Sequence, residues 1–404
     1  MSQSAPPSFC SPFQGVVETL SGGLGTVAAL SSDDLYLWRA AQQADLGQGR
    51  CSPNPPVGAL VVRDDEVVGQ GFHARAGGVH GEVAALDQAG SQARGATLYV
   101  TLEPCNHHGR TGPCTERIIR EGVGRVVVGV RDPNPRVVGN GIARLQEAGI
   151  EVSIASGAVA ARCQALIAPF AKSSIQQSPW VIAKVAVSDD GCVGKAGVPR
   201  YPITGPEAQR WVHTLRDRVD AILIGAGTAM TDDPSLTVRH EHPSRSDGKN
   251  PLRIVIDGAL RTSPNQQVYQ RQARDVGAGA SACVVHRPGV NESKMADFDS
   301  AGIRRIEVDA ENGRISLSAL WEQLARLDIV SVLVEPGPGL YRALVGQNAI
   351  HELWWLQAPI QLGETGLRLM DAPRDSLPAM PNFHAGIQRH PVGADWLHIG
   401  TIQG

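Results

Sequence analysis

Apolar runs and segments with helical periodicity alternate along the first part of the chain. A turn at Asp64-Asp65 separates the first two runs, and the segments between the later runs place apolar residues at helical spacing. Strands are predicted at five runs: 57–62, 67–69, 98–102, 126–130 and 151–154. Alternation of this kind predicts an α/β domain in which helices cover both faces of a sheet.

Polar residues mark where the helices of this domain begin. Asp33-Asp34 is expected to cap the first helix. A second helix is predicted to start near His80, and a third carries Cys114 in its first turn. A fourth helix is expected at 142–148.

The second half of the chain has its own alternation and predicts a second α/β domain. Strands are predicted at 181–187, 221–224, 252–256, 282–285, 330–334, 353–356 and 396–399. A helix is expected over Pro206–Arg216 with Thr204 as its capping residue, and another at 317–327 after Ser316. Loops are predicted at two polar segments, 240–250 and 286–300.

Composition shifts indicate where the domains begin and end. Residues 1–32 contain no Lys or Arg, which fits neither a secretory signal nor a transit peptide, so we expect a mobile extension there. The first domain is predicted at 33–172 and the second at 180–404. Residues 173–179, which are polar and end in Ser-Pro, are the expected linker.

Overall composition narrows the class of protein. A chain of 404 residues is long enough for two cores. A net charge of −3 argues against binding of nucleic acid, and no apolar run is long enough to span a bilayer. Seven scattered cysteines form no disulfide framework, which favours reduced thiols in the cytoplasm. We therefore expect a cytoplasmic homo-oligomer that acts on a small molecule.

One constellation in the first domain carries specific chemistry. His80 is followed after 25 residues by Cys105, and then by Cys114. An imidazole and two thiols make three ligands for zinc and leave a fourth position for water. Glu82 follows the His where a hydrolytic deaminase needs a residue to take the proton of that water and pass it to the departing amine. The sequence therefore predicts a catalytic zinc site with Glu82 as the acid/base.

Two other interpretations of this constellation are open. The site is closed and structural if His107 or His108 supplies a fourth ligand. A deaminase acting on RNA would be expected to show a basic surface and Cys-x-x-Cys spacing, whereas eight residues separate Cys105 and Cys114 here.

The segment Thr101–Cys114, which reads TLEPCNHHGRTGPC, resembles the zinc segment of the bacterial riboflavin-biosynthesis deaminase/reductase family, RibD. Three more stretches agree with that resemblance: SPNPPVG at 52–58, GFHARAG at 71–77, and DPNP at 132–135 with Gly139 and Gly141. The resemblance implies a cytidine-deaminase-like α/β/α fold. It also implies that Asn54 and His73 bind the heterocycle and that His107 and Arg110 are candidates for its phosphate.

The second half resembles the reductase domain of the same family, which has a dihydrofolate-reductase-like α/β fold. Lys184 lies within an apolar strand, a position that by itself is typical of an edge lysine reaching water. The stretch at 220–228, a strand running into Gly-x-Gly, and DDPSLTVR at 232–239 match the family. The resemblance implies NADPH contacts at Val187, Thr228, Asp232, Gly258, Gly337 and Gly339. It implies substrate contacts at Lys184, Arg216, Leu236, Arg239 and Glu335.

The family resemblance implies two reactions on one substrate. Zinc-dependent deamination of 2,5-diamino-6-ribosylamino-4(3H)-pyrimidinone 5′-phosphate would be followed by NADPH reduction of its ribosyl group, giving 5-amino-6-ribitylamino-uracil 5′-phosphate.

Three positions depart from the family pattern. Pro336 stands in a turn where the family has Gly. Pro202 stands where the family usually has an aromatic residue, and Tyr201 is a possible substitute. The segment 166–170 lacks the Asn that the family often has there. The first two leave an alternative, an active deaminase fused to a catalytically inactive reductase-like domain.

Overall fold

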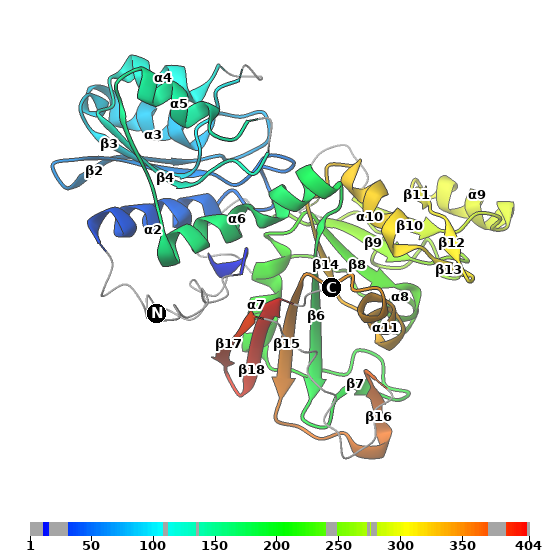
Figure 1. Ribbon diagram of the computed structural model, residues 1–404. Helices are drawn as coiled ribbons and strands as arrows, with labels where there is room; N and C mark the ends of the chain where they lie inside the picture. Colours follow the sequence, from blue (N-terminus) through cyan, green and yellow to red (C-terminus); the bar gives the residue numbers. More distant parts are fainter. Residues whose placement is uncertain are drawn as a thin grey trace. The chain divides into compact units, whose positions relative to one another are not determined.

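The computed structural model describes residues 11–15, 31–107, 112–134, 137–239, 249–272, 275, 281–370 and 385–401 (Figure 1). The chain divides into two compact units, residues 1–176 and 177–404. Within the described residues, no helix combines the length and the apolar character that crossing a membrane requires.

A five-stranded sheet forms the centre of the first unit. Its strands are β1 (Gly58–Arg63), β2 (Glu66–Phe72), β3 (Thr97–Leu102), β4 (Arg125–Val130) and β5 (Glu151–Ile154). Their order is β2-β1-β3-β4-β5; β1 is antiparallel to β2 and β3, whereas β3, β4 and β5 are parallel. The strands are built from Val, Leu and Ile, whose branched side chains suit the buried faces of a sheet.

Helices cover both faces of this sheet, as the alternating pattern predicts. They are α2 (Ser32–Asp45), α3 (Gly81–Ala89), α4 (Cys114–Glu121), α5 (Asn140–Glu147) and α6 (Gly157–Gln176), with a short 3₁₀ helix η2 at Gly90–Ala93. Helices α2 and α6 lie on one face, and α3, α4 and α5 lie on the other (Figure 1). The α/β/α architecture expected for this part of the chain is confirmed.

Three local expectations for this unit are wrong. The cap of α2 is Ser31, whose hydroxyl accepts the Asp34 N–H at 3.2 Å, and not Asp33-Asp34. Residues 11–15 belong to the folded structure, because Phe13 is 2% exposed and Gln48 Nε2 donates to the Pro12 carbonyl at 2.6 Å. Helix α6 runs through Gln176, so the first four residues of the expected linker are helical.

The second unit is built on a nine-stranded sheet with the order β11-β10-β9-β8-β14-β6-β15-β18-β17. Its strands are β6 (Trp180–Ser188), β8 (Ala221–Gly225), β9 (Leu252–Ile256), β10 (Ala282–His286), β11 (Arg304–Glu307), β14 (Ser331–Val334), β15 (Glu352–Ala358), β17 (Ala385–Val392) and β18 (Asp395–Thr401). The strands from β11 to β15 in this order are parallel, and β18 and β17 follow antiparallel. Two small sheets pair β7 (Cys192–Lys195) with β16 (Gly366–Arg368), and β12 (Ala310–Glu311) with β13 (Arg314–Ile315).

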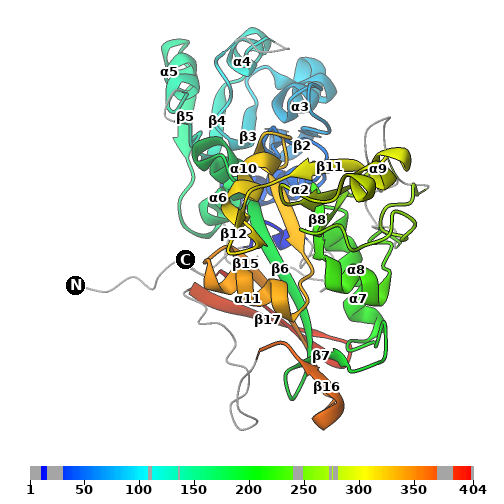
Figure 2. The same ribbon diagram turned by 90° about the vertical axis from the view of Figure 1, so that its right-hand side faces the viewer.

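The helices of the second unit are α7 (Pro206–Arg216), α8 (Ala226–Asp232), α9 (Glu292–Ser300), α10 (Leu317–Ala325) and α11 (Pro338–Gly346), with a 3₁₀ helix η3 at Gly363–Thr365. Apolar residues of α10 and α11 join the main core on one face of the sheet, and α7 lies on the other side (Figure 2).

Three expectations for this unit need correction. Gly205, not Thr204, is the N-cap of α7, whereas Ser316 is the N-cap of α10 as expected, without a side-chain capping bond. Residues 292–300 form α9 and not a loop, and residues 240–248 of the other expected loop lie outside the described residues. Residues 226–232 form a helix where the sequence indicated only a glycine turn.

A buried carboxylate fixes the segment that leaves β3. Glu103 is 5% exposed and accepts four backbone N–H bonds. Their donors are Asp132, Gly139, Gly141 and Ile142, at 3.0 to 3.3 Å. Gly141 leaves no room for a side chain, because a Cβ there would lie 2.0 Å from the Pro104 carbonyl oxygen. The N-terminus of α5 is therefore held directly against the Glu103-Pro104-Cys105 segment.

Replacing Glu103 by Gln should destabilise the first unit. An amide offers one acceptor oxygen and turns an NH₂ group toward backbone donors, so about 2 kcal/mol should be lost, as when charged hydrogen bonds are broken. Differential scanning calorimetry should show the transition of this unit lowered by about 4–8 °C. Glu151→Gln, which removes a surface carboxylate from the same unit, should shift it by about 2 °C or less. Equal shifts for the two variants would contradict this role of Glu103.

Candidate active sites

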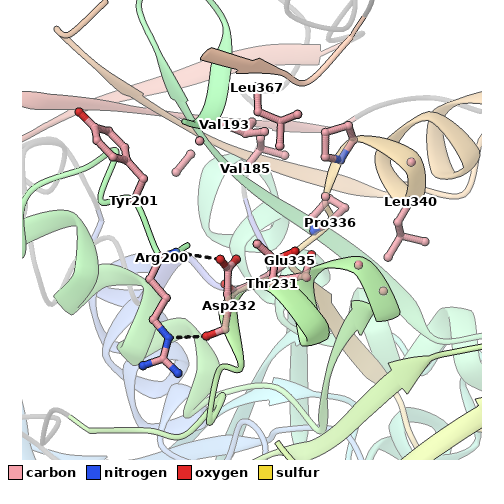
Figure 3. Close-up of a pocket in the computed structure, with 18 of the residues that line it drawn as sticks. Val185, Val193, Arg200, Tyr201, Thr231, Asp232, Glu335, Pro336, Leu340 and Leu367 are labelled. Carbon is pink, nitrogen blue, oxygen red and sulfur yellow. Dashed lines mark hydrogen bonds between the residues drawn. The ribbon is translucent and has the colours of Figure 1, made fainter. Parts of the chain in front are cut away.

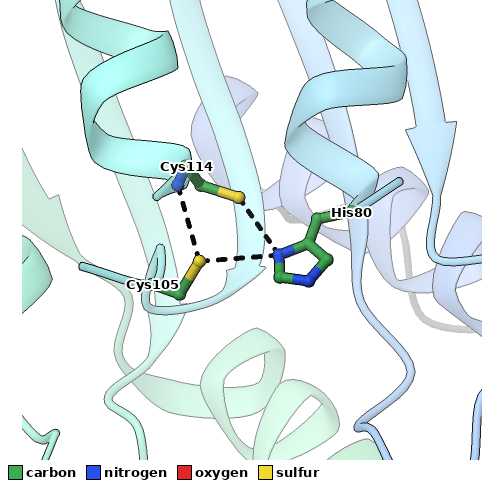
Figure 4. A group of neighbouring side chains, drawn as sticks. All are labelled: His80, Cys105 and Cys114. Carbon is green, nitrogen blue, oxygen red and sulfur yellow. Dashed lines mark hydrogen bonds between the residues drawn. The ribbon is translucent and has the colours of Figure 1, made fainter. Parts of the chain in front are cut away.

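Three side chains with metal-binding atoms meet at one edge of the first sheet. His80 is the N-cap of α3, Cys105 follows β3, and Cys114 is the first residue of α4. The Nδ1 atom of His80 lies 3.2 Å from the Cys114 sulfur and 3.5 Å from the Cys105 sulfur (Figure 4). One nitrogen and two sulfurs suit zinc. In the described part of the chain no fourth His, Cys, Asp or Glu joins this group, and an open three-ligand set is typical of catalytic zinc.

The electrostatics of this cluster favour a thiolate. The Cys114 thiol donates to Cys105, which lowers the pKa of Cys105 and raises the pKa of Cys114. The Cys114 backbone N–H, at the N-terminus of α4, also donates to the Cys105 sulfur at 3.4 Å. The contact with Cys105 raises the pKa of His80. A helix N-terminus and an imidazole thus stabilise negative charge where a cation would bind.

Glu82 lies beside the cluster in the first turn of α3. It is 3% exposed, and burial raises its pKa to about 7, with a further rise from the nearby Cys105 thiolate. A carboxyl group with a pKa near neutrality can both donate and accept a proton at a small cost in free energy. The cluster therefore combines a metal-binding set with an adjacent acid/base.

Asn54 and His73 form a fixed pair near the metal-binding residues. His73 Nδ1 lies 2.9 Å from the Val79 carbonyl, which only accepts, so Nδ1 carries the proton. Burial lowers the pKa of His73, so its ring is neutral and Nε2 accepts from the Asn54 amide nitrogen at 3.0 Å. This bond determines the orientation of the Asn54 amide. The His73 ring also meets the His80 ring edge-on, with centroids 5.2 Å apart.

Of the two residues expected at the substrate phosphate, His107 and Arg110, the structure describes only His107. His107 is exposed just after the Cys105 segment, and Arg110 lies outside the described residues, as does His108. Sequence reasoning missed Thr115 and Asn106. The Thr115 hydroxyl donates to Asn106 Oδ1 at 2.8 Å, and the Thr115 N–H donates to the Cys105 carbonyl at 3.3 Å. These bonds hold the Cys105 segment to α4.

The second unit contains a cavity of about 460 Å³ at the carboxyl ends of its parallel strands (Figure 3). Ligands of open α/β sheets bind at such edges. Of the residues predicted to bind cofactor or substrate, six line the cavity: Lys184, Thr228, Asp232, Glu335, Gly337 and Gly339. Helices α8 and α11 both begin at the cavity wall, so their unpaired N–H groups suit a phosphate-bearing ligand.

A carboxylate whose side chain is 14% exposed joins two cations at this cavity. Glu335 follows β14, and its Oε2 lies 3.0 Å from Lys184 Nζ while its Oε1 lies 2.7 Å from Arg216 Nη2. Burial acts to raise the pKa of Glu335, but the charges of Arg216 and Lys184 outweigh it and hold the pKa at about 2. Lys184 is therefore held inside the site and does not reach out to water like an edge lysine.

The remaining residues predicted for this site are not among those that line the cavity. Val187 is buried near the end of β6, and Gly258 follows β9. Leu236 is buried, and its φ of 51° is a strained backbone conformation for a bulky residue. Arg216 Nη1 donates to the carbonyl of the following residue, Thr237. Burial and the charge of Arg216 lower the pKa of Arg239.

The two proline departures leave the local helices intact. Pro336 lines the cavity just before Gly337, the N-cap of α11, and Pro338 occupies the first turn, where a missing N–H costs no helical bond. Tyr201, next to Pro202, lines the same cavity. Sequence reasoning missed Arg200, which also lines it, because no local pattern in the sequence marks the residue.

Comparison with known proteins identifies the family to which each part of the chain is similar. Residues 31–130 match the cytidine and deoxycytidylate deaminase zinc-binding region, and residues 179–380 match the RibD C-terminal domain. The riboflavin biosynthesis protein RibD of Escherichia coli is 37% identical over 382 residues, which cover 91% of this chain and 99% of the relative. The RibD of a Synechocystis strain is 34% identical and covers 92% of this chain and 97% of its own.

Solved structures match over both units. Acinetobacter baumannii RibD has a TM-score of 0.78 at 32% identity, and the match covers 92% of this chain and 99% of that one. A deaminase/reductase from Thermotoga maritima has a TM-score of 0.77 at 30% identity, with the same coverage. The predicted combination of a cytidine-deaminase-like domain with a RibD-type reductase domain is thus confirmed, as is the use of zinc and NADPH. The chain belongs to the RibD family, the bifunctional deaminase/reductases of riboflavin biosynthesis.

Proposed function

We propose that the first unit hydrolyses the amino group of 2,5-diamino-6-ribosylamino-4(3H)-pyrimidinone 5′-phosphate. The second unit then reduces the ribosyl group of the product to ribityl with NADPH. The observation that carries the proposal is the convergence of His80, Cys105 and Cys114 with the buried Glu82 beside them.

In the first unit, His80, Cys105 and Cys114 hold the metal. A bound zinc ion supplies an electrophilic centre that makes water acidic enough to act as a nucleophile near neutral pH. Glu82 accepts a proton from the attacking water and delivers it to the departing ammonia. Asn54, with its amide oriented by His73, binds the heterocycle, and His107 and Arg110 bind the phosphate.

In the second unit, the cavity binds the cofactor and the ribosyl chain. Bound NADPH supplies the hydride. Thr228, Asp232, Gly337 and Gly339, which line the cavity, contact the cofactor together with Val187 and Gly258. Lys184 and Glu335, which also line the cavity, hold the ribosyl group. The guanidinium groups of Arg216 and Arg239 suit the dianionic phosphate of the substrate, and Leu236 contacts the substrate with them.

We also propose that the protein works as a homo-oligomer in the cytoplasm. Two observations support the location: no described helix could cross a membrane, and the described cysteines are all free thiols, as expected in a reducing compartment.

The reductase half is tested by supplying the deaminated pyrimidine, 5-amino-6-ribosylamino-uracil 5′-phosphate, directly to the purified protein with NADPH. This substrate bypasses the zinc site. We expect stoichiometric consumption of NADPH. Ammonia release from the diamino compound without any NADPH consumption would instead support the alternative of a catalytically inactive reductase-like domain.

Replacing Glu82 by Gln should abolish most of the deaminase activity and leave the reductase activity unchanged. Loss of a general acid/base lowers kcat by about 10²–10⁴. Ammonia release should fall by this factor, while zinc content, measured after acid release, stays at the wild-type level. Cys105→Ser should instead lose the metal. Both variants should retain NADPH consumption on the deaminated substrate. Full ammonia release by a zinc-loaded Glu82→Gln protein would reject the proposed acid/base.

Asn54 and His73 should act as one unit in substrate binding. Asn54→Ala should raise the deaminase KM about ten-fold or more, as expected when a buried hydrogen bond to a ligand is lost. His73→Phe keeps a ring but removes the Nε2 acceptor, so Asn54 is no longer oriented and KM should rise similarly. The double variant should be little worse than either single one, because the two changes break the same contact. Additive losses would mean that the two side chains bind the substrate independently.

Replacing Glu335 by Gln should lower the reductase kcat/KM by about 10²-fold, since Lys184 and Arg216 lose their shared partner. Ammonia release should be unchanged.

The folded pKa of Glu335 lies below its unfolded value, so the carboxylate stabilises the fold above pH 4.5 and this contribution is lost as the pH falls toward 2. The difference in unfolding free energy between wild type and Glu335→Gln should shrink over that range. A pH-independent difference would contradict the low pKa.

A further inference from the structure

Arg200 closes one side of the cavity in the second unit. It belongs to the loop 196–204, which connects β7 to α7, and it lines the cavity together with Tyr201 and Asp232 (Figure 3). Its backbone N–H donates to Asp232 Oδ1 at 2.9 Å. Its guanidinium turns toward the same residue, with Nε donating to the Asp232 carbonyl and Nη2 donating to the Asp233 carbonyl at 2.6 Å.

These contacts cap the C-terminal end of α8 from a distant part of the chain. Asp232 is the last residue of α8 and Asp233 is its C-cap, so their carbonyls have no partner within the helix. A cation is favourable at this end, where the helix carries partial negative charge. One planar guanidinium serves both carbonyls at once, which a single ammonium group does less well.

The cap has a consequence at the opposite end of the helix. Helix α8 has seven residues, and its first turn, with Gly227 and Thr228, lines the cavity. A helix this short is not stable by itself, so its position depends on what holds its ends. The far end is also tied to the 263–270 segment, because Asp233 Oδ1 accepts the Gln267 N–H at 2.8 Å and Gln266 Nε2 donates to the Ala229 carbonyl at 2.6 Å.

The backbone of Arg200 is adapted to this contact. Its φ is 53°, in the left-handed region that glycine adopts freely and that other residues adopt at a cost. The side chain is about half exposed, at 55%, so packing in the core does not account for the conformation. The bonds to Asp232 and Asp233 are what hold the residue there.

We propose that Arg200 is a positioning residue for the nicotinamide cofactor: it fastens the 196–204 loop to the end of α8 and so holds the Asp232 carboxylate and the first turn of α8 in place for NADPH. This inference rests on the proposed function, in which this cavity binds the cofactor. Arg200 acts through Asp232 and α8 and does not itself contact the reacting atoms.

The test compares Arg200→Lys, Arg200→Gly and Arg200→Ala in the full-length, zinc-loaded protein. Glycine accepts the positive φ and keeps the backbone N–H bond to Asp232, so Arg200→Gly isolates the guanidinium. Lysine keeps a cation that reaches one carbonyl. Arg210→Lys, at an exposed arginine on α7 of the same unit, is the matched control. The Kd for NADPH is measured by the fluorescence of the bound nicotinamide, with no pyrimidine present, and kcat and KM are measured separately.

We expect Arg200→Gly to raise the Kd and the KM for NADPH about ten-fold, the effect of losing charge-assisted bonds, with kcat changed less than about three-fold. Arg200→Ala should bind NADPH more weakly than Arg200→Gly, because alanine is strained at the positive φ. Arg200→Lys should recover part of the affinity for NADPH that Arg200→Gly loses. Arg210→Lys should bind like the wild type. Ammonia release and the unfolding midpoint of Arg200→Gly should match the wild type, which separates positioning from a general loss of folding.

Two outcomes would overturn the inference. Binding of NADPH to Arg200→Gly with the wild-type Kd would show that the guanidinium does not position the cofactor. Alternatively, the KM for the pyrimidine rises while the Kd for NADPH stays constant, which would make Arg200 a substrate-binding residue. A failure of the proposed function is distinct from both, because in that case the wild-type protein itself would not bind NADPH.

Discussion

In both units, the metal-binding and charged side chains of the candidate sites lie where parallel strands end and helices begin. The strands deliver Cys105 and Glu335, and the helix N-termini present His80, Cys114 and Gly337 to the same edge. Unpaired N–H groups at these termini attract negative charge, whether a thiolate in the first unit or a phosphate-bearing ligand in the second. The order of the strands thus determines where each reaction takes place, because it determines which ends lie side by side.

The two sites treat a buried glutamate in opposite ways. Glu82 and Glu335 are both withdrawn from water, which by itself favours the neutral acid. Glu82 has a thiolate nearby and its pKa rises to about 7, whereas Glu335 has two cations within 3.0 Å and its pKa falls to about 2. The first arrangement suits a residue that must exchange a proton in each turnover. The second suits a residue that must keep its charge and hold other groups in place.

Local patterns predicted the elements that are both regular and amphipathic. The strand 252–256 and the helix 206–216 have the predicted bounds, and the metal-binding residues were predicted because a His and two Cys carry a recognisable chemistry. Helix α9 was missed because only Phe298 in it is buried, so it has no apolar stripe to detect. Arg200 was missed for a different reason. Its partners lie 32 and 33 residues away, and only the folded chain brings them together.

The tight contact between Gly141 and the Pro104 carbonyl bears on how the spacing of the two cysteines should be interpreted. Cys105 is fixed from behind by β3 and α5, and Cys114 is fixed by the start of α4 and by its N–H bond to the Cys105 sulfur. The positions of both sulfurs are thus determined outside the segment that connects them. The eight-residue spacing is therefore compatible with the metal-binding geometry, because neither sulfur depends on the connecting segment for its position.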